Sequence, residues 1–580
     1  MYRHLALARW RRNPLVTRLE NPLIIQSDRS LLLETHGVHY EAARDALARF
    51  AELEKSPEHL HTYRITPLSL WNAAASGLKT DDVLSSLKTY SKYDLPPNVA
   101  RDIRDYMGRY GRVRLRKEGD LLLLEVDDRA LATEIANNKQ LQPLIRARRH
   151  TGLVFEVDAG DRGRIKQALI HMGYPAEDLA GYVDGEALDL NLLLVDREGT
   201  PFGLREYQQE AADVFYAGGG SRGGSGVVVL PCGSGKTIIG LATIARCKTA
   251  TLILCSSTTA VRQWKRELLL KTSLLPDDIG EYTGDRKEVR PVTLTTYQIL
   301  SYRSRKDDRF PHFELFDARN WGLILYDEVH LLPAPVFRIT ADLQARRRLG
   351  LTATLIREDG LETDVFSLIG PKKYDLPWKD LERQGWIATA ECHELRVPMD
   401  EALRMEYAVT DDRLKYRVAA ENPAKVVLAH QLVQKHKDDC VLVIGQYIEQ
   451  LELLAHVFQA PLITGKTKNH EREHLYEQFR RGAIKLLVVS KVANFAIDLP
   501  DANVAIQVSG TFGSRQEEAQ RLGRILRPKS DGSIAHFYSL VTRESRDQDF
   551  ASKRQLYLTE QGYHYDIEDV DVAVDRIAVS

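Results

Sequence analysis

The chain has 580 residues, of which 43% are hydrophobic and 28% are charged, and its formal net charge at pH 7 is −1. This length predicts several domains. The near-zero charge excludes a basic field over the whole surface, so any nucleic-acid site must be a local patch. The five cysteines include no Cys-x-x-Cys pair, which argues against a disulfide framework, a zinc ribbon or an iron–sulfur cluster and fits a reducing cytoplasm. The sequence has no apolar run of membrane-spanning length, and we expect no membrane partner.

Residues 1–140 are expected to form a mostly helical domain that ends in a β-hairpin. A strand is expected at 31–33 and a helix over 41–55, where apolar residues recur at helical spacing. Three further helices begin at polar capping residues, namely Thr66, Thr80 and Asn98. The hairpin joins 112–115 to 121–126. Helices followed by a hairpin are typical of a winged-helix module that docks on DNA or protein, and an ordinary helical domain explains the pattern equally well.

Residues 141–196 are expected to form a separate small α/β domain. Its strand, Leu153–Val157, precedes a helix that Asp161 caps and Gly173 ends. The basic run Arg146–His150 suits either phosphate contacts or an exposed linker.

A phosphate-binding loop is the strongest signal in the sequence. It follows the apolar run 227–230, which suits a strand buried on both faces of a parallel sheet. Two glycines let successive backbone N–H groups point into one concavity, and a helix begins directly after them. Lys236 is expected to reach the β- and γ-phosphates, and the Thr237 hydroxyl is expected to hold Mg²⁺. The residues expected to line the phosphates are Pro231, Cys232, Gly233, Ser234 and Gly235.

Polar residues on either side of this loop are candidates for nucleotide and nucleic-acid contacts. Upstream, Gln208 carries a donor and an acceptor that suit an adenine edge. Downstream, hydroxyls follow apolar strands at 256–259 and 295–296, ahead of helix N-termini. This position suits sugar-phosphate contacts, and it equally suits simple helix capping. The nucleic-acid candidates in this stretch are Thr258, Trp264 and Thr296.

A second nucleotide-binding element is expected at Asp327–His330, after the apolar strand 321–326. A carboxylate at the tip of a buried strand can hold Mg²⁺ through water, and an adjacent carboxylate can orient the attacking water. These roles fall to Asp327 and Glu328, and His330 would lie near the cleft. An Asp-Glu pair after a strand is by itself often only a helix cap. Together with the phosphate loop, it indicates a two-part nucleotide site.

A third strand, 349–354, carries two hydroxyls at its end, Thr352 and Thr354. The triplet Arg357-Glu358-Asp359 follows directly. From about residue 378, strands alternating with helices indicate a second α/β lobe. The expected strands there are 441–444, 486–489 and 504–508.

The helix Gln516–Arg527 in this second lobe carries arginines three residues apart, which share one helical face. Such a face suits an arginine finger that neutralises a γ-phosphoryl group, and it also suits a solvated basic stripe. The spacing Gln520-Arg521-x-Gly523-Arg524-x-x-Arg527 favours the first interpretation.

The run His470-Glu471-Arg472-Glu473-His474 matches the H-E-x-x-H zinc pattern. It is highly charged and leads into an amphipathic helix, and the sequence shows no convincing third ligand. We therefore expect a solvent-facing helix rather than a zinc protease.

Taken in order, these motifs resemble the motif set of superfamily 2 helicases, and within it the XPB DNA helicase family. The resemblance covers about 150–545 and rests on LPCGSGKT, DEVH, LGLTATLIRED, LIGPKKYDL and QEEAQRLGRILR. It implies an α/β fold with two RecA-like lobes, at 197–377 and 378–580. Residues 141–196 are similar to the family's damage-recognition segment, and 1–140 are similar to the extra domain of bacterial members.

The resemblance also implies an ATP- and Mg²⁺-dependent DNA helicase with 3′→5′ polarity, acting in nucleotide excision repair or transcription, cytoplasmic and nucleoid-associated. It places Arg205 and Gln208 by the adenine, Asp327 and Glu328 in metal and water chemistry, and Arg357, Glu358 and Asp359 in duplex opening. The other implied roles are γ-phosphate contact for Arg524 and Arg527, coupling for Asp498 in its motif, and a link between hydrolysis and movement for Thr352, Thr354 and Gln520.

Two departures from the family bear on strand separation. The family's Gly-Asp-Thr is replaced by Ala493-Asn494-Phe495, and the thumb expected within 401–422 matches poorly. Two alternatives therefore stay open: a duplex translocase that remodels protein–DNA complexes, and an ATP-gated scaffold that recruits a nuclease through 1–140. The expected partners are single-stranded, forked or damaged DNA and a nuclease or other repair protein.

Overall fold

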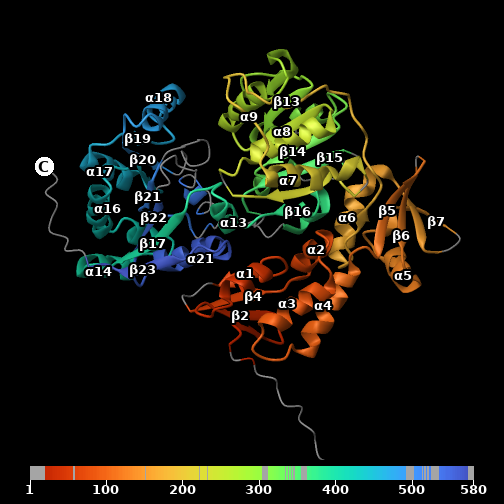
Figure 1. Ribbon diagram of the computed structural model, residues 1–580, viewed down its shortest axis with the longest axis horizontal. Helices are drawn as coiled ribbons and strands as arrows, with labels where there is room; N and C mark the ends of the chain where they lie inside the picture. The colour runs from red at the N-terminus through yellow and green to blue at the C-terminus, as the bar shows by residue number, and fades with distance from the viewer. Residues whose placement is uncertain are drawn as a thin grey trace, which may run out of the picture. The chain divides into compact units, whose positions relative to one another are not determined.

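The computed structural model describes residues 18, 20–55, 59–119, 121–149, 152–220, 222–231, 233–303, 311–333, 335–336, 339–340, 343, 346–354, 362–490, 502–512, 514, 518, 521–523, 525 and 534–571. The chain divides into two compact units, Met1–Gly108 and Arg109–Ser580 (Figure 1). No helix in the described part of the chain is both long and apolar enough to cross a membrane.

The first unit is more β-rich than the sequence predicts. Its described strands form an antiparallel sheet in the order β1-β2-β4-β3. The bounds are β1 Leu23–Ile25, β2 Ser30–Glu34, β3 Glu52–Lys55 and β4 Leu60–Arg64, with helices α1 Tyr40–Leu47, α2 Pro67–Ala75, α3 Thr80–Tyr90 and α4 Pro97–Arg109. The helix expected over 41–55 is therefore wrong beyond Leu47, because Leu53 is buried as a strand residue paired with Tyr63. The Thr66 cap is confirmed, since its hydroxyl accepts from Ser69 N at 3.0 Å.

The hairpin expected at the end of the first domain belongs to a different sheet. Its strands, β5 Val113–Glu118 and β6 Leu121–Val126, join a five-stranded mixed sheet in the order β7-β8-β6-β5-β9. The other strands are β7 Ile145–Arg148, β8 Val154–Val157 and β9 Glu177–Asp178, with helices α5 Arg129–Asn137 and α6 Arg162–His171. The expected boundary at 140/141 falls inside this sheet, because β6 pairs with β5 on one side and with β8 on the other.

The first lobe is a parallel sheet in the order β12-β13-β11-β14-β15-β10-β16, with all described pairings parallel. Its strands are β10 Ser225–Val229, β11 Thr251–Cys255, β12 Ile279–Tyr282, β13 Val292–Thr296, β14 Leu323–Asp327, β15 Arg347–Thr352 and β16 Lys372–Asp375, and its main helices are α7 Glu206–Tyr216, α8 Lys236–Cys247, α9 Thr258–Lys271 and α10 Tyr297–Leu300. Every residue of β10 and β11 is buried, as continuous apolar runs of a sheet covered on both faces require.

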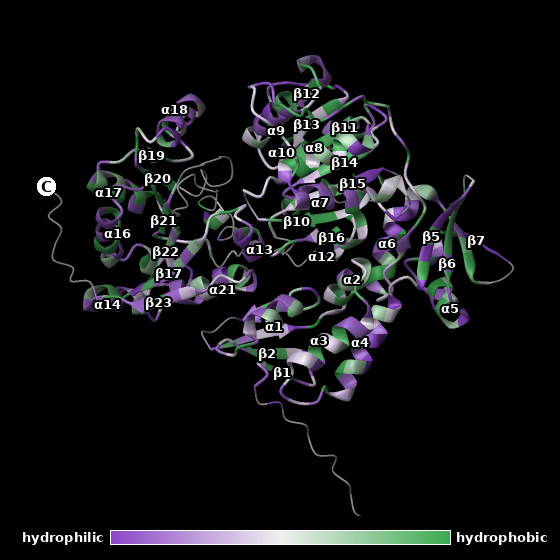
Figure 2. Cartoon of the chain, viewed as in Figure 1, coloured by the Kyte–Doolittle hydropathy of each residue, from purple (hydrophilic) through white to green (hydrophobic). Residues whose placement is uncertain are grey.

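The second lobe repeats this architecture in the order β19-β20-β18-β21-β22-β17-β23. Its strands are β17 Ala390–Val397, β18 Val441–Gly445, β19 Leu462–Ile463, β20 Leu486–Ser490, β21 Val504–Gln507, β22 Ala535–Thr542 and β23 Tyr565–Asp569. The described helices include α13 Trp378–Arg383, α14 Glu401–Val409, α15 Lys415–Ala420, α16 Pro423–Lys435, α17 Ile448–Phe458, α18 Asn469–Arg480 and α21 Arg546–Glu560. The expected α/β class with two parallel-sheet lobes is confirmed, and the central strands of both sheets are mostly hydrophobic in Figure 2.

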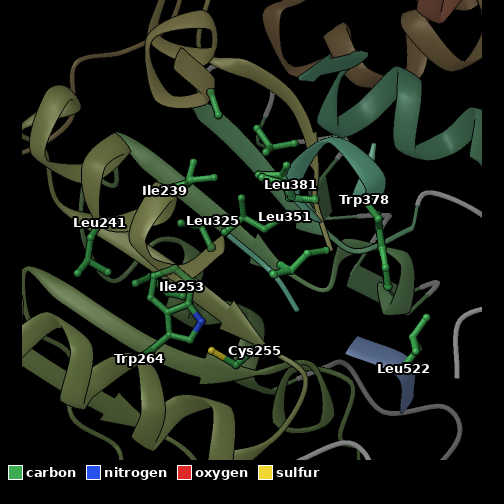
Figure 3. Close-up of a cluster of buried hydrophobic side chains, with 14 of the residues drawn as sticks. Ile239, Leu241, Ile253, Cys255, Trp264, Leu325, Leu351, Trp378, Leu381 and Leu522 are labelled. Atoms are coloured by element: carbon green, nitrogen blue, oxygen red, sulfur yellow. The ribbon is translucent and has the colours of Figure 1, made fainter. Parts of the chain in front are cut away.

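The core beneath the candidate site is packed between α8, α9 and the first parallel sheet. Ile239 on α8 and Leu325 and Leu351 on the sheet are fully buried in one cluster with Trp264 on α9. Figure 3 shows these side chains gathered together. The same close packing requires glycine at position 240, because a Cβ there would lie 2.4 Å from the Trp264 ring.

Candidate functional site

Three sequence motifs meet at one edge of the first lobe because they follow three neighbouring strands. In the sheet, β15 lies between β14 and β10, and all three run parallel, so their carboxyl ends share an edge. The phosphate loop follows β10, the carboxylates end β14, and the hydroxyl pair ends β15. Ligands of open parallel sheets bind outside the carboxyl ends of the strands, which makes this edge the candidate site.

Two glycines give the phosphate loop its shape. Gly233 has φ +82° and Gly235 has φ +81°, in the left-handed region that glycine adopts without steric cost. Helix α8 begins at Lys236, directly after the second glycine. A Cβ on Gly235 would lie 2.6 Å from Gln208 Nε2, so this glycine is also required by close packing. Cys232 lies outside the described residues.

Hydrogen bonds among its own residues hold the loop. Ser234 is fully buried, and its hydroxyl donates to the Pro231 carbonyl at 2.7 Å. Lys236 Nζ lies across the loop and donates to the carbonyls of Leu230 and Pro231, each at 3.2 Å. The ammonium group is therefore already held at the mouth of the loop, where a phosphate chain would lie.

Gln208 packs against the phosphate loop with both ends of its amide engaged. Its Oε1 accepts from Arg205 N at 3.1 Å, and its Nε2 donates to the Ser234 carbonyl at 3.1 Å. Tyr207 donates to the same carbonyl at 2.5 Å, and the Arg205 guanidinium lies over the Trp386 ring at 4.4 Å. This stretch thus supports the back of the loop. The adenine contacts of Arg205 and Gln208 stay predictions.

Asp327 ends β14 as a partly buried carboxylate held by two aromatic residues. Its Oδ2 accepts from Trp264 Nε1 at 2.9 Å, and its backbone carbonyl accepts from the Tyr297 hydroxyl at 2.9 Å. Burial, with the neighbouring Glu328 charge as the next cause, raises the pKa of Asp327 to about 6. A carboxylate pair that repels itself at low dielectric is well suited to a divalent cation.

Glu328 is held in a sparsely populated backbone conformation. Its φ of +51° and ψ of +56° lie in the left-handed region, which is uncommon for a residue with a side chain. Its Oε2 lies 3.5 Å from His330 Nδ1, and no described residue donates a hydrogen bond to that oxygen. The carboxylate is therefore positioned to accept from a water or substrate hydroxyl, as a water-orienting residue must.

His330 connects the carboxylate motif to the hydroxyl pair. Its Nδ1 lies 2.7 Å from the Thr352 hydroxyl, which donates to the Thr354 carbonyl at 2.6 Å and accepts from Thr354 N at 3.2 Å. Because that hydroxyl has only one proton and gives it to a carbonyl, Nδ1 of His330 is the donor to Thr352. A change at Glu328 can thus pass through His330 to the end of β15.

The residues of this edge fit a magnesium nucleotide. The left-handed glycines open a backbone concavity at the start of α8, and Glu328 offers a buried oxygen without a donor among the described residues. Thr237 is the second residue of α8, and Asp327 is the partly buried carboxylate at the end of β14. Thr237 and Asp327 are thus the residues that could hold Mg²⁺.

The residues that the sequence predicts to contact nucleic acid differ in their solvent exposure. Thr258 is exposed at the first turn of α9 and stays a candidate. Trp264 is 1% exposed and Thr296 is 4% exposed. Side chains this buried cannot reach a DNA strand, so both are corrected. Trp264 instead supports Asp327, and the Thr296 hydroxyl caps α10 by accepting from Ile299 N at 3.3 Å. The Arg357-Glu358-Asp359 triplet lies outside the described residues.

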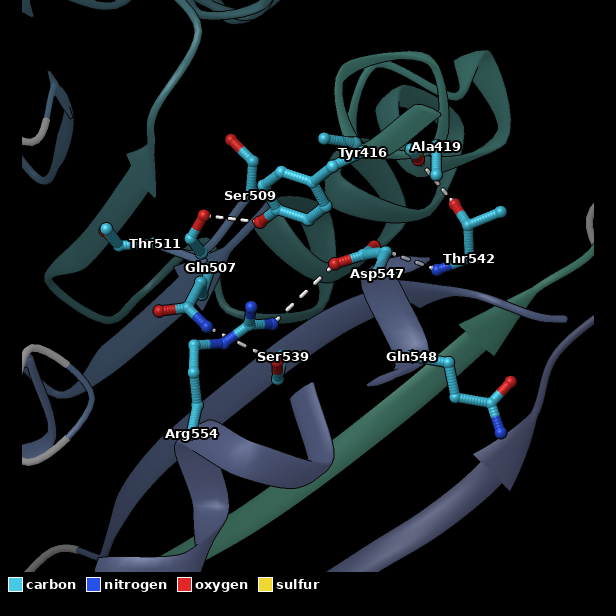
Figure 4. Close-up of polar contacts among 12 residues, drawn as sticks. Tyr416, Ala419, Gln507, Ser509, Thr511, Ser539, Thr542, Asp547, Gln548 and Arg554 are labelled. Atoms are coloured by element: carbon cyan, nitrogen blue, oxygen red, sulfur yellow. Dashed lines mark hydrogen bonds and ion pairs between the residues drawn. The ribbon is translucent and has the colours of Figure 1, made fainter. Parts of the chain in front are cut away.

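In the second lobe, a buried polar network anchors the described residues that precede the candidate arginines. Glu518 and Arg521 are fully buried, and Arg521 donates to Gln507 and to the Thr511 hydroxyl. Arg554 on α21 lies 3.6 Å from Glu518 and 3.7 Å from Asp547 (Figure 4). Arg521 is therefore an anchor rather than a solvated residue. Four predicted site residues of this lobe, Asp498, Gln520, Arg524 and Arg527, lie outside the described residues.

Tyr207 and Tyr297 are site residues that sequence reasoning missed. Each donates to a backbone carbonyl of a motif, Tyr207 at the phosphate loop and Tyr297 at Asp327. Tyr207 directly precedes Gln208, so the sequence pattern that indicated Gln208 could also have indicated Tyr207. No pattern in the sequence connects Tyr297 to Asp327, because the contact depends on β13 and β14 both pairing with β11.

Comparisons with known proteins cover nearly the whole chain. Family models match residues 381–576 (ERCC3/RAD25/XPB C-terminal helicase), 201–357 (type III restriction enzyme, res subunit) and 23–150 (helicase conserved C-terminal domain). The chain is 56% identical to the DNA 3′-5′ helicase XPB of Mycobacterium tuberculosis, over 95% of this chain and 98% of that protein. It is 54% identical to the protein of the same name from Kineococcus radiotolerans, over 95% of this chain and 97% of that protein. It is 35% identical to the general transcription and DNA repair factor IIH helicase/translocase subunit XPB of Enterocytozoon bieneusi, over 94% of this chain and 92% of that protein.

Proposed function

This chain belongs to the XPB DNA helicase family, and we propose that it is an ATP-dependent DNA helicase that moves 3′→5′ and opens DNA in nucleotide excision repair or transcription-linked repair. The observation that carries this proposal is the meeting of the phosphate loop, the carboxylate pair and the hydroxyl pair at one sheet edge. The names of the relatives supply the polarity and the repair role.

Residues of the first lobe are proposed to hold the nucleotide and to orient the attacking water. The loop N–H groups and Lys236 hold the β- and γ-phosphates, with Lys236 exchanging its carbonyl contacts for phosphate oxygens. Glu328 orients the attacking water through its buried, undonated oxygen. Thr237 and Asp327 would hold Mg²⁺, which would supply positive charge opposite the phosphate oxygens.

Coupling of hydrolysis to movement follows from the His330 bridge. His330 lies near Glu328 and donates to Thr352, so loss of the γ-phosphate can alter both contacts together. From the second lobe, Arg524 and Arg527 are proposed to contact the γ-phosphate, with Gln520 and Asp498 in coupling. The buried Glu518 and Arg521 support this proposal, because they anchor the residues that precede these arginines in the sequence.

DNA contact is proposed for Thr258, with duplex opening assigned to Arg357, Glu358 and Asp359. Since such contacts go mainly to phosphates, binding should weaken steeply as salt rises. Residues 1–140 are proposed to recruit a nuclease or another repair protein. Helices α14 and α15 occupy the stretch where the thumb is expected, and a grip on the strand is proposed for them.

The test of this proposal is ATP hydrolysis without nucleic acid and with single-stranded DNA, duplex DNA, forked DNA or RNA. Lys236→Ala and Glu328→Gln should each abolish the DNA-stimulated rate. Lys248→Ala, at the other end of α8 and half exposed, should leave it unchanged. DNA-stimulated hydrolysis that survives Lys236→Ala contradicts the site, and equal stimulation by RNA contradicts the DNA specificity.

A pair of displacement assays then separates unwinding from translocation alone. A helicase displaces an annealed strand from a fork, whereas a duplex translocase displaces a triplex-forming strand and leaves the fork intact. Strand displacement is the expected result.

A further inference from the structure

A cluster of metal-ligating side chains lies in the second lobe, away from the nucleotide motifs. Glu391 and His393 are two residues apart on β17, so their side chains lie on the same face of the sheet. His536 lies on the neighbouring parallel strand β22, in register with Glu391. The two strands are adjacent in Figure 1 although they are far apart in the sequence.

The ligand atoms of these three residues converge. Glu391 Oε2 lies 3.4 Å from His536 Nδ1 and 3.9 Å from His393 Nε2, and all the ligand atoms lie within 4.8 Å of one another. Both ring nitrogens are buried, and neither has a hydrogen-bond partner among the described residues. Buried polar atoms are nearly always hydrogen-bonded, so two on facing rings require an explanation.

The surroundings hold these rings in place without using the converging atoms. The rings of His393 and Tyr538 stack at 4.8 Å with an interplanar angle of 17°. His436 is fully occupied, since its Nδ1 lies 2.9 Å from Asp439 and its Nε2 lies 3.0 Å from the Tyr538 hydroxyl. His436 is therefore a support for the stack and not a ligand.

The charges around the cluster suit a cation. Asp566 Oδ2 lies 3.8 Å from His393 Nδ1, on the side of the ring away from Glu391. This distance is too long for a hydrogen bond, so Asp566 acts on the ring through its negative charge. The Lys435 ammonium lies by Tyr538, at 3.4 Å from its hydroxyl, and not among the three converging atoms. Burial lowers the pKa of both His393 and His536.

We propose that Glu391, His393 and His536 bind a divalent transition-metal cation of the Zn²⁺ class. Imidazole and carboxylate ligands suit Zn²⁺, Ni²⁺ or Co²⁺ rather than Mg²⁺ or Ca²⁺. Three protein ligands leave at least one position for water, because Zn²⁺ takes four. Since Glu391 is exposed and the two rings are half-buried, a cation can enter from solvent.

The position of the site indicates what the cation does. Glu391 and His536 lie near the amino ends of β17 and β22, whereas the polar network of Figure 4 contacts the carboxyl end of β22 at Thr542. The cation would cross-link two strands that are distant in the sequence and stabilise the folded lobe. It would take no part in ATP hydrolysis.

The test measures Zn²⁺ binding to the full chain after treatment with chelator, by calorimetry without nucleotide, with Co²⁺ absorption as a second readout. The chain has 17 histidines, so variants must separate this site from others. His536→Gln and Glu391→Gln should each weaken one equivalent of Zn²⁺ about 10-fold or more. His430→Gln, exposed on α16 of the same lobe, should leave that equivalent unchanged.

The exposed pair His470 and His474 on α18 is the main competing site, and the double variant His470→Gln/His474→Gln removes it. In that double variant, the equivalent of Zn²⁺ that His536→Gln weakens should still bind. A Zn²⁺-dependent rise in melting temperature of about 5 °C, at 100-fold excess over Kd, should also vanish only in the site variants. Thermal melts in chelator establish that each variant folds. The proposal is overturned if folded His536→Gln binds Zn²⁺ as the wild type does. It is also overturned if replacing His470 and His474 on α18 abolishes all tight Zn²⁺ binding.

Discussion

Trp264→Phe is the variant that isolates the support of the candidate magnesium carboxylate. Trp264 is 1% exposed and donates to Asp327 Oδ2 at 2.9 Å. Phenylalanine keeps most of the buried ring and removes the donor. A hydrogen bond to a charged group contributes about 1.5–3 kcal/mol, and losing it favours the protonated carboxyl, which binds no metal. We therefore expect the Mg²⁺ concentration for half-maximal ATPase to rise about 10- to 100-fold.

The first lobe offers a matched control in Trp321→Phe. Trp321 is fully buried, and its Nε1 donates to the Leu315 carbonyl, also at 2.9 Å. The two variants thus lose the same ring atoms and one hydrogen bond of equal length, but only one of these bonds reaches the site. Trp321→Phe should lower the melting temperature and leave the Mg²⁺ dependence unchanged.

The assay is DNA-stimulated ATP hydrolysis at saturating ATP and DNA, titrated with Mg²⁺ at pH 7, beside a thermal melt of each variant. An unchanged Mg²⁺ midpoint in Trp264→Phe would refute the support role. An equal shift in both tryptophan variants would show that the effect comes from general loosening of the lobe rather than from Asp327.

Three further predictions concern other buried contacts. Gly235→Ala should abolish most of the ATPase, since a Cβ there would lie 2.6 Å from a packed amide nitrogen, whereas Gly77→Ala, with φ +90° and open space, should cost only about 1–2 kcal/mol of stability. Asp178→Asn leaves two buried cations without their counter-ion and should cost about 3–5 kcal/mol in urea denaturation. Arg554→Met leaves buried carboxylates behind and should cost about 3 kcal/mol or more, beside a change within about 0.5 kcal/mol for the exposed Lys553→Met.

Each of these outcomes has a direct contradiction. Wild-type hydrolysis by Gly235→Ala would mean that the loop does not need its left-handed glycine. A neutral Asp178→Asn would show that water reaches Arg162 and Lys166. Equal melting temperatures for the Arg554 and Lys553 variants would remove the network as an anchor of the helix that includes Glu518.

The class of fold and the first-lobe motifs could be predicted from the sequence, because their signals are local. A glycine that must turn, a lysine at a helix start and an apolar run buried on both faces each act over a few residues. The loop Gly233–Thr237, the strand end at Asp327 and the parallel strands of both lobes could therefore be located without knowing any partner strand.

Contacts between distant residues could not be predicted, because the sequence pattern of a strand does not determine which strand it pairs with. The strands of 112–126 looked like the end of one domain and instead pair within the next sheet. Trp264 was a candidate for DNA contact, yet its indole donates to Asp327 in the core. His393 and His536 became neighbours only through the register of β17 with β22. In each case the sequence gives the type of the residue. The partner that its side chain contacts depends on long-range strand pairing and on close packing in the core.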